Sequence, residues 1–239
     1  MTDDNQWVTA SDLQSRLAKD AEFKAIQAER AQRNAEYYRR LGEDARPFEE
    51  ALRSVDPRFR RMDSLTAPKE RLSSVVVALL LEWLPRLKEN RNKEMLIRGL
   101  IAAKEPFDGQ PLVDCFMADS LEESLRFPIA NTMAYAKVTG INDWLVEAVQ
   151  VKRYGTSRAM LAEAVAKHVP RKLAREVLLK LLDDIPGPAA SGLARFGGFE
   201  ELQAIKARVE SATGWQKKDM ERAIRKIEDR LEKQSNRKK

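Results

Sequence analysis

The stretch Met-Leu-Ala-Glu-Ala-Val-Ala-Lys at residues 160–167 is one of four similar segments, and their repetition determines the fold expected for the chain. In each segment an apolar run ends on a small residue that is followed directly by a basic residue. The basic residue suits the end of a helix, because a cation complements the negative end of the helix dipole. The four small residues lie 33, 30 and 28 residues apart, at Ala103, Ala136, Ala166 and Ala194.

A helix-breaking residue follows each of these pairs, and a second amphipathic segment follows the break. The breaks are Gly109, Gly140, Pro170 and the pair Gly197-Gly198. One such helical hairpin cannot bury its apolar face alone, whereas stacked neighbours can. A period of roughly 30–45 residues built from paired helices is typical of α-solenoids. We therefore expect an all-α protein, an α-solenoid of four to five antiparallel helix pairs with a long N-terminal helical extension.

The segment from Met160 to Lys167, followed by a helix that closes on Asp183-Asp184, resembles a short HEAT-like repeat, and so does the stretch from Ile129 to Val149. HEAT-like and armadillo-type repeats carry an arginine followed by small residues, and Arg158 stands at that position. The resemblance covers about half of the chain with degenerate repeats, and it implies an α-solenoid. Three positions depart from the pattern: Met95, Pro128 and Pro186.

The sequence divides into three parts. Residues 1–68 are expected to form a polar helical extension and linker, in which Gly42 ends a long helix and Pro47–Leu52 forms a short one. Residues 69–234 are expected to form the HEAT-like solenoid with a C-terminal capping helix, because a terminal repeat needs a polar outer face. Residues 235–239 are expected to be a basic, disordered tail.

Composition narrows the class of protein. The chain has 239 residues, of which 43% are hydrophobic and 33% charged, as is ordinary for a soluble helical protein. No run of 18 apolar residues is present, so we expect no membrane span. The acidic, polar start does not fit a signal peptide, and a single cysteine allows no internal disulfide, so a cytoplasmic location is the default expectation. Most of the net charge of +6 lies in the last 25 residues.

Few residues suit catalysis. His168 is the only histidine and Cys115 the only cysteine, so we expect no metal site and no cofactor, with His168 at a helix end and Cys115 buried. No phosphate-binding loop, dinucleotide-binding glycine pattern or nucleophile elbow is present. HEAT-like DNA glycosylases that remove alkylated bases use a groove with tryptophans and a carboxylate. Asp143-Trp144 is an adjacent aspartate–tryptophan pair, and it keeps that enzymatic alternative open.

The role that the sequence favours is therefore a non-catalytic one, a protein–protein interaction scaffold or adaptor that binds a macromolecular partner along a solenoid surface. The candidate partner-binding residues are the cations of the four repeats, Lys104, Lys137, Lys167 and Arg195, with Arg58, Arg60 and Arg61 of a basic loop around Phe59. The partner is expected to be a protein, acidic in character. Two alternatives remain: the repeat cations only cap helix ends, or the protein binds nucleic acid.

Overall fold

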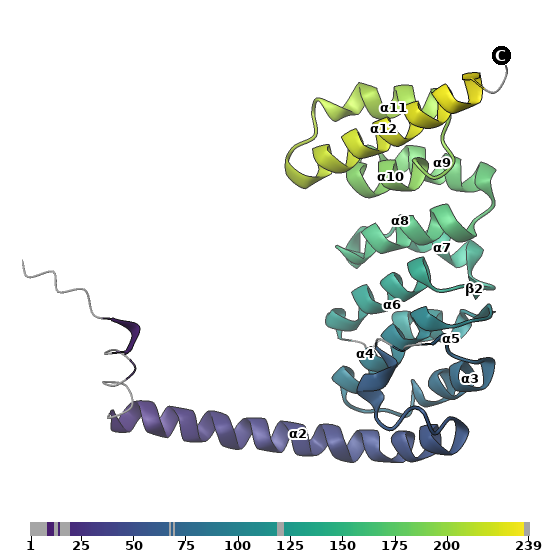
Figure 1. The fold of residues 1–239 in the computed structure, drawn as a ribbon. Helices are drawn as coiled ribbons and strands as arrows, with labels where there is room; N and C mark the ends of the chain where they lie inside the picture. The colour runs from purple at the N-terminus through teal and green to yellow at the C-terminus, as the bar shows by residue number, and fades with distance from the viewer. Residues whose placement is uncertain are drawn as a thin grey trace, which may run out of the picture.

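The computed structural model describes residues 9–11, 14, 20–66, 68, 70–118 and 122–236. Within these residues the chain forms eleven α-helices, α2 to α12, and the prediction of an all-α protein is confirmed. Three short 3₁₀ helices lie between them, η1 (Met62–Leu65), η2 (Leu100–Ala102) and η3 (Lys152–Tyr154). The long helix α2 (Ala21–Val55) lies at the foot of the molecule, and the other helices rise from one end of it (Figure 1).

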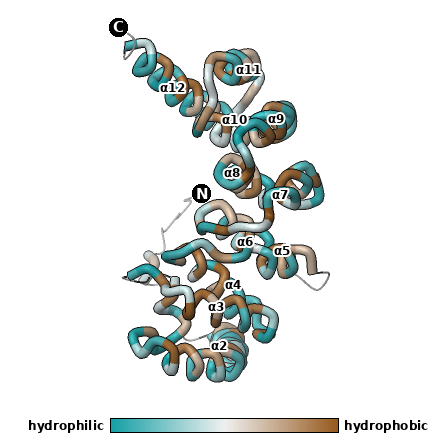
Figure 2. The backbone as a smooth tube through the Cα atoms, turned by 90° about the vertical axis from the view of Figure 1, so that its right-hand side faces the viewer, coloured by the Kyte–Doolittle hydropathy of each residue, from teal (hydrophilic) through white to brown (hydrophobic). Residues whose placement is uncertain are grey.

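The helices above α2 form two columns. Successive members of the first column pack on one another (Figure 2). They are α4 (Asn90–Gly99), α6 (Glu123–Tyr135), α8 (Ser157–His168), α10 (Pro186–Leu193) and α12 (Gly214–Asn236). Each helix of the second column packs against a helix of the first. They are α3 (Ser74–Trp83), α5 (Gln110–Met117), α7 (Asn142–Ala148), α9 (Arg171–Leu181) and α11 (Phe199–Val209).

The expected breaks lie where the chain crosses between columns. Gly109 precedes α5, Gly140 lies just before α7, Pro170 precedes α9 and Gly198 precedes α11. Gly140 has φ +79°, a left-handed conformation that glycine adopts without steric cost. The connectors also pair with one another: β1 (Phe107–Asp108) lies parallel to β2 (Val138–Thr139), and Leu72 forms a parallel bridge with Ala103. Both pairings join residues 31 positions apart, which matches the sequence period.

Packing between the pairs depends on small and buried residues at close approaches. A Cβ at Gly192 of α10 would stand 3.2 Å from Ala166 of α8 and 3.0 Å from Leu178 of α9, so three helices meet closely there. Arg158, at the start of α8, is 4% exposed and donates to the carbonyl of Val149 at 2.8 Å and to Asp184 at 2.5 Å. Arginine and aspartate therefore pair across one helical hairpin.

Helix α2 differs from the sequence prediction. Gly42 does not end it, and Pro47–Leu52 is not a separate helix: α2 continues through Pro47 to Val55. Tertiary contacts outweigh the local breakers here. Asp44 accepts hydrogen bonds from the backbone N–H groups of Lys88 (2.9 Å) and Glu89 (3.1 Å), just before α4, and so fixes α2 against the body.

The boundaries between the parts of the chain also differ from those expected from the sequence. Ala45, Phe48 and Leu52 of α2 are buried in the body, so the division expected at residue 68 does not separate two packing units. The part of α2 that stands clear of the body ends near Leu41 instead (Figure 1). At the other end, α12 continues to Asn236, so two residues assigned to the disordered tail are helical, and residues 237–239 lie outside the described part of the chain.

Candidate functional site: a basic edge on the helix stack

The four repeat cations lie where the first-column helices end. Lys104 follows η2, Lys137 follows α6, Lys167 is in the last turn of α8, and Arg195 lies just after α10. We call these four residues the basic edge. The ammonium group of Lys137 donates to the carbonyl of Lys104 at 3.0 Å, which joins the first two units of the edge directly.

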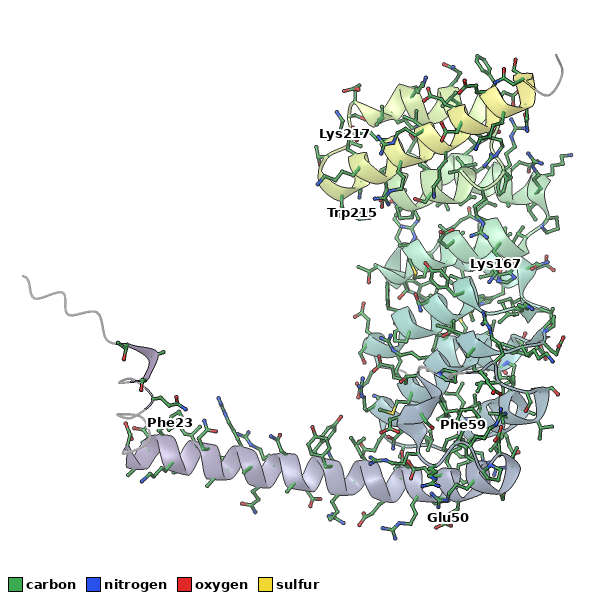
Figure 3. All side chains as sticks on the ribbon, in the orientation of Figure 1. Phe23, Glu50, Phe59, Lys167, Trp215 and Lys217 are labelled. Carbon is green, nitrogen blue, oxygen red and sulfur yellow. The ribbon has the colours of Figure 1, made fainter. Side chains whose placement is uncertain are left out.

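Lys167 is bound more firmly than its neighbours. Its ammonium group donates to the carbonyls of Ala134, Tyr135 and Ala136, at 3.1, 2.7 and 2.8 Å. These carbonyls belong to the last turn of α6 and have no partner inside that helix. Lys167 therefore caps the helix of the preceding pair, and Figure 3 shows it on the side of the stack. The expectation that a repeat cation caps a helix end is met by Lys167, although the helix is a neighbour's rather than its own.

His168 takes part in the same contact. Its Nε2 lies 2.8 Å from the carbonyl of Met133, one residue before the carbonyls that Lys167 caps. Burial lowers the pKa of His168 below its usual value, and the positive charge of Lys167 lowers this pKa further. The neutral imidazole therefore donates its Nε2–H to the carbonyl at neutral pH.

The charges of the basic edge are close enough to influence one another. Burial is the main cause that lowers the pKa of Lys167, and the positive charges of Arg195 and Lys137 lower it further. Glu163 acts in the opposite direction, and its carboxylate lies 3.7 Å from the guanidinium of Arg195. Three successive helix pairs thus contribute to one positive field, which the carboxylate of Glu163 offsets in part.

Sequence reasoning missed Tyr135, an aromatic residue in the middle of the basic edge. Its carbonyl accepts a hydrogen bond from Lys167, and the residue as a whole is 56% exposed. The sequence did contain a signal for its exposure. The second copy reads Met-Ala-Tyr-Ala-Lys, and a buried position in its middle would favour a small or apolar residue over tyrosine. An exposed tyrosine among cations is a typical anchor of a protein interface.

The basic loop lies at the foot of the molecule, where Figure 3 labels Phe59. Arg58 pairs with Asp56 at 2.7 Å and with Glu70, and the acidic neighbours raise its pKa. Phe59 is buried. Arg60 and Arg61 are exposed, and Arg61 lies 3.7 Å from Asp63. Arg58 is therefore engaged in ion pairs within the chain.

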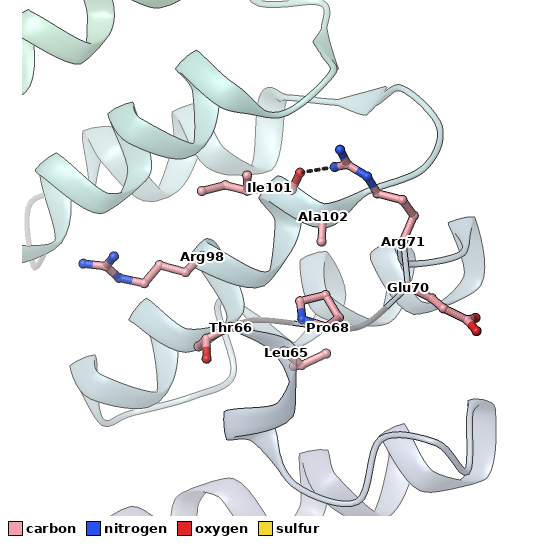
Figure 4. A pocket seen from close by; sticks show the side chains of 8 residues that line it. All are labelled: Leu65, Thr66, Pro68, Glu70, Arg71, Arg98, Ile101 and Ala102. Carbon is pink, nitrogen blue, oxygen red and sulfur yellow. Dashed lines mark hydrogen bonds between the residues drawn. The ribbon is translucent and has the colours of Figure 1, made fainter.

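An open hollow lies beside the residues that follow this loop (Figure 4). It has a volume of about 400 Å³ and is lined by Leu65, Arg71, Arg98 and Ile101 among others. Arg71 donates to the carbonyl of Ile101 at 3.3 Å across its rim, which ties the connector before α3 to η2. The hollow lies between the connector before α3 and η2. It is open, and Arg71 is bonded to the backbone at its rim, so its lining does not indicate an enclosed ligand site.

Two of the candidate residues for catalysis, Trp144 and Cys115, pack against the core. Trp144 lies edge-on to Phe116, with ring centroids 5.3 Å apart, so its ring helps to join α5 and α7, while the adjacent Asp143 is exposed. Asp143 and Trp144 both lie in α7, a helix of the second column. Cys115 is half-buried, and burial raises the pKa of its thiol, which disfavours the reactive thiolate.

Over the ranges that the structure describes, no three histidine, cysteine, aspartate or glutamate side chains are grouped to hold a metal ion. None of the helices in those ranges is both long enough and apolar enough to cross a membrane. The basic edge with Tyr135 is thus the surface that the residues themselves single out. Comparison of the chain with protein-family models, curated proteins and solved structures finds no match, so its function has to be inferred from this surface.

Proposed function

We propose that the helix pairs form a HEAT-like α-solenoid and that the protein is a non-catalytic adaptor, which binds an acidic segment of a protein partner along its basic edge. The observation that carries the proposal is the meeting of cations from successive helix pairs. Lys137 bonds to the backbone of Lys104, and the charges of Lys137 and Arg195 both act on Lys167. Like charges held together repel, and an anionic partner relieves that repulsion.

The members of the edge have different roles in this proposal. Lys167 holds three carbonyls of α6, so it supports the edge rather than contacting the partner. Lys104, Lys137 and Arg195 are exposed and present their charge outward. Tyr135, two residues before Lys137, adds an exposed aromatic side chain. A partner segment with carboxylates and one apolar residue fits this combination of charge and ring.

Reversal of the two exposed lysines tests the proposal. The probe is a fluorescent glutamate-rich peptide with one central leucine, and the measurement is its affinity by anisotropy. Each exposed ion pair contributes only about 0.2–1 kcal/mol, but reversal turns two attractions into repulsions, so Lys104→Glu/Lys137→Glu is expected to weaken binding by about tenfold. The melting temperature should change little, because both side chains are exposed.

A matched control carries the same change in net charge on α12, where Lys218 and Arg225 are exposed. Lys218→Glu/Arg225→Glu is expected to bind the peptide like the unaltered protein. Equal weakening by both double variants would mean that only net charge matters, and would contradict the proposal. A DNA duplex is tested in parallel: binding that exceeds the peptide's and falls steeply with salt would identify a nucleic-acid-binding protein instead.

A further inference from the structure

The face of α2 that packs on the body continues beyond the body as an exposed stripe. Ala45, Phe48 and Leu52 bury this face against the other helices. Earlier members of the stripe follow at spacings of three and four residues, the spacing of one helix face, namely Phe23, Ile26, Arg30, Asn34, Tyr37 and Leu41. Ile26 is 40% exposed and Tyr37 38% exposed, so apolar side chains of this stripe meet solvent.

A helix of about 20 residues outside a packed body is only marginally stable in water, and packing of an apolar face usually stabilises it. Local ion pairs, such as Glu29 with Arg33 at 3.7 Å, add only a few tenths of a kcal/mol each. We propose that the exposed segment of α2, from Ala21 to Leu41, pairs in antiparallel orientation with the same segment of a second copy of the chain.

The charges beside the stripe identify the occupant and the orientation. Glu22, Glu29, Arg33 and Arg40 follow one flank of the stripe, acidic in the first half of the segment and basic in the second. In a two-fold symmetric antiparallel pair the same flank of each helix faces its counterpart, so residue i meets residue j and j meets i. Centred near residues 31 and 32, this arrangement sets Glu22 opposite Arg40 and Glu29 opposite Arg33, each pair occurring twice. A parallel pair would instead set this flank against the opposite flank of the partner helix, and these charge pairs would be lost.

The register that pairs these charges also pairs the residues of the stripe. Apolar residues then face apolar residues at both ends, and polar residues meet in the middle, where they can fix the register. The pairs are Phe23 with Leu41, Ile26 with Tyr37, and Arg30 with Asn34.

The part of α2 that adjoins the body leaves space for the end of a second helix. A groove of about 550 Å³ lies there, with Tyr37, Leu41 and Met95 among its lining residues. The proposed register carries Phe23 of the second copy, which lies at the free end of α2 (Figure 3), to this groove. The paired segments end where each body begins, so the two bodies lie at opposite ends of the helix pair (Figure 1).

Cysteine cross-linking of the full chain tests the orientation. Two variants are made in a Cys115→Ala background, one with Ile26→Cys and one with Tyr37→Cys. An antiparallel pair brings these positions together only between the two variants, since equal positions lie about 16 Å apart along the axis. Disulfide-linked dimers are therefore expected in the mixture and not in either variant alone. A dimer formed by Ile26→Cys alone, or the same yield in all samples, would overturn the proposal.

Charge variants test the register by sedimentation equilibrium. Glu29→Arg and Arg33→Glu should each weaken self-association by about tenfold, because each sets like charges opposite one another at two places. Both changes also break the ion pair within the helix, yet an equal mixture should regain the original affinity as a mixed dimer. Gln32→Arg, on the opposite face of α2, serves as the control and should leave self-association unchanged. A chain that stays monomeric up to about 100 μM, or a mixture no tighter than its components, would contradict the proposal.

Discussion

At the scale of single residues, the contacts at the end of α6 show what one of the recurring basic residues does. Lys167 and His168 together bind the carbonyls of residues 133 to 136, which the helix itself leaves without partners. Lys167 is thus a structural link between successive helix pairs before it is a binding residue. Only the members with exposed side chains are free to serve a partner as well.

His168 gives this link a pH dependence. Its pKa is lower in the folded chain than in the unfolded chain, so the unfolded state binds the proton more readily. Stability is therefore complete above the ordinary histidine pKa of about 6.5 and is lost as pH falls through the lower pKa of the folded state. Chemical denaturation between pH 7.5 and 5 should show decreasing stability. His168→Gln, which keeps an N–H donor without a titrating group, should flatten this part of the profile; an unchanged slope would show that other groups cause it.

Leu178 reports on the packing between helix pairs. It is fully buried and lies beside Gly192 of α10, where α8 and α9 also approach. Leu178→Ala removes apolar contacts and leaves a cavity, so we expect a loss of about 2–5 kcal/mol in the free energy of unfolding. Urea denaturation measures it. The exposed Leu173 on the same helix is the matched control, and Leu173→Ala should cost less than about 0.5 kcal/mol. Similar losses of stability for both variants would mean that the wrong face of α9 has been assigned to the core.

At the scale of elements, α2 has two parts with different energetic roles. Its last third supplies buried side chains and the Asp44 contacts that fix the start of α4, whereas its first 20 residues stand in solvent. Deletion of residues 1–36 should leave the melting temperature within about 2 °C of the full chain. Deletion of residues 1–52 removes Phe48 and Leu52 from the core and should abolish the cooperative transition or lower its midpoint strongly. Loss of the cooperative unfolding transition in the shorter deletion would show that the first part of α2 belongs to the core.

The same elements show what the sequence could and could not predict. The breaks before α5, α7, α9 and α11 were located, because glycine and proline act locally. The continuity of α2 through Gly42 and Pro47 was missed, since it depends on Asp44 and Phe48 meeting residues more than 30 positions away. Among the site residues, the recurrence of the cations was visible. The partners of Lys167 and the exposure of Tyr135 were not, because both depend on how one helix pair lies on the next.

At the scale of the whole molecule, the stack and the free helix present two separate surfaces. The basic edge runs along the ends of the first-column helices, and the exposed segment of α2 extends away from the foot of the stack (Figure 1). We assign the binding of an acidic partner to the first surface and the joining of two copies to the second. Two linked copies would present two basic edges to a partner with repeated acidic segments, and such bivalent binding is tighter than either contact alone.

Hydrogen exchange of the full chain with and without the glutamate-rich peptide tests the central claim most directly. Bound peptide should slow amide exchange in residues 103–105, 134–138, 166–169 and 194–196, which carry the basic edge, and leave the first half of α2 unchanged. The same peptide added to Lys104→Glu/Lys137→Glu should give little protection at these positions. Protection confined to α2 or to α12, or no protection at peptide concentrations that saturate the anisotropy signal, would contradict the assignment of the binding surface.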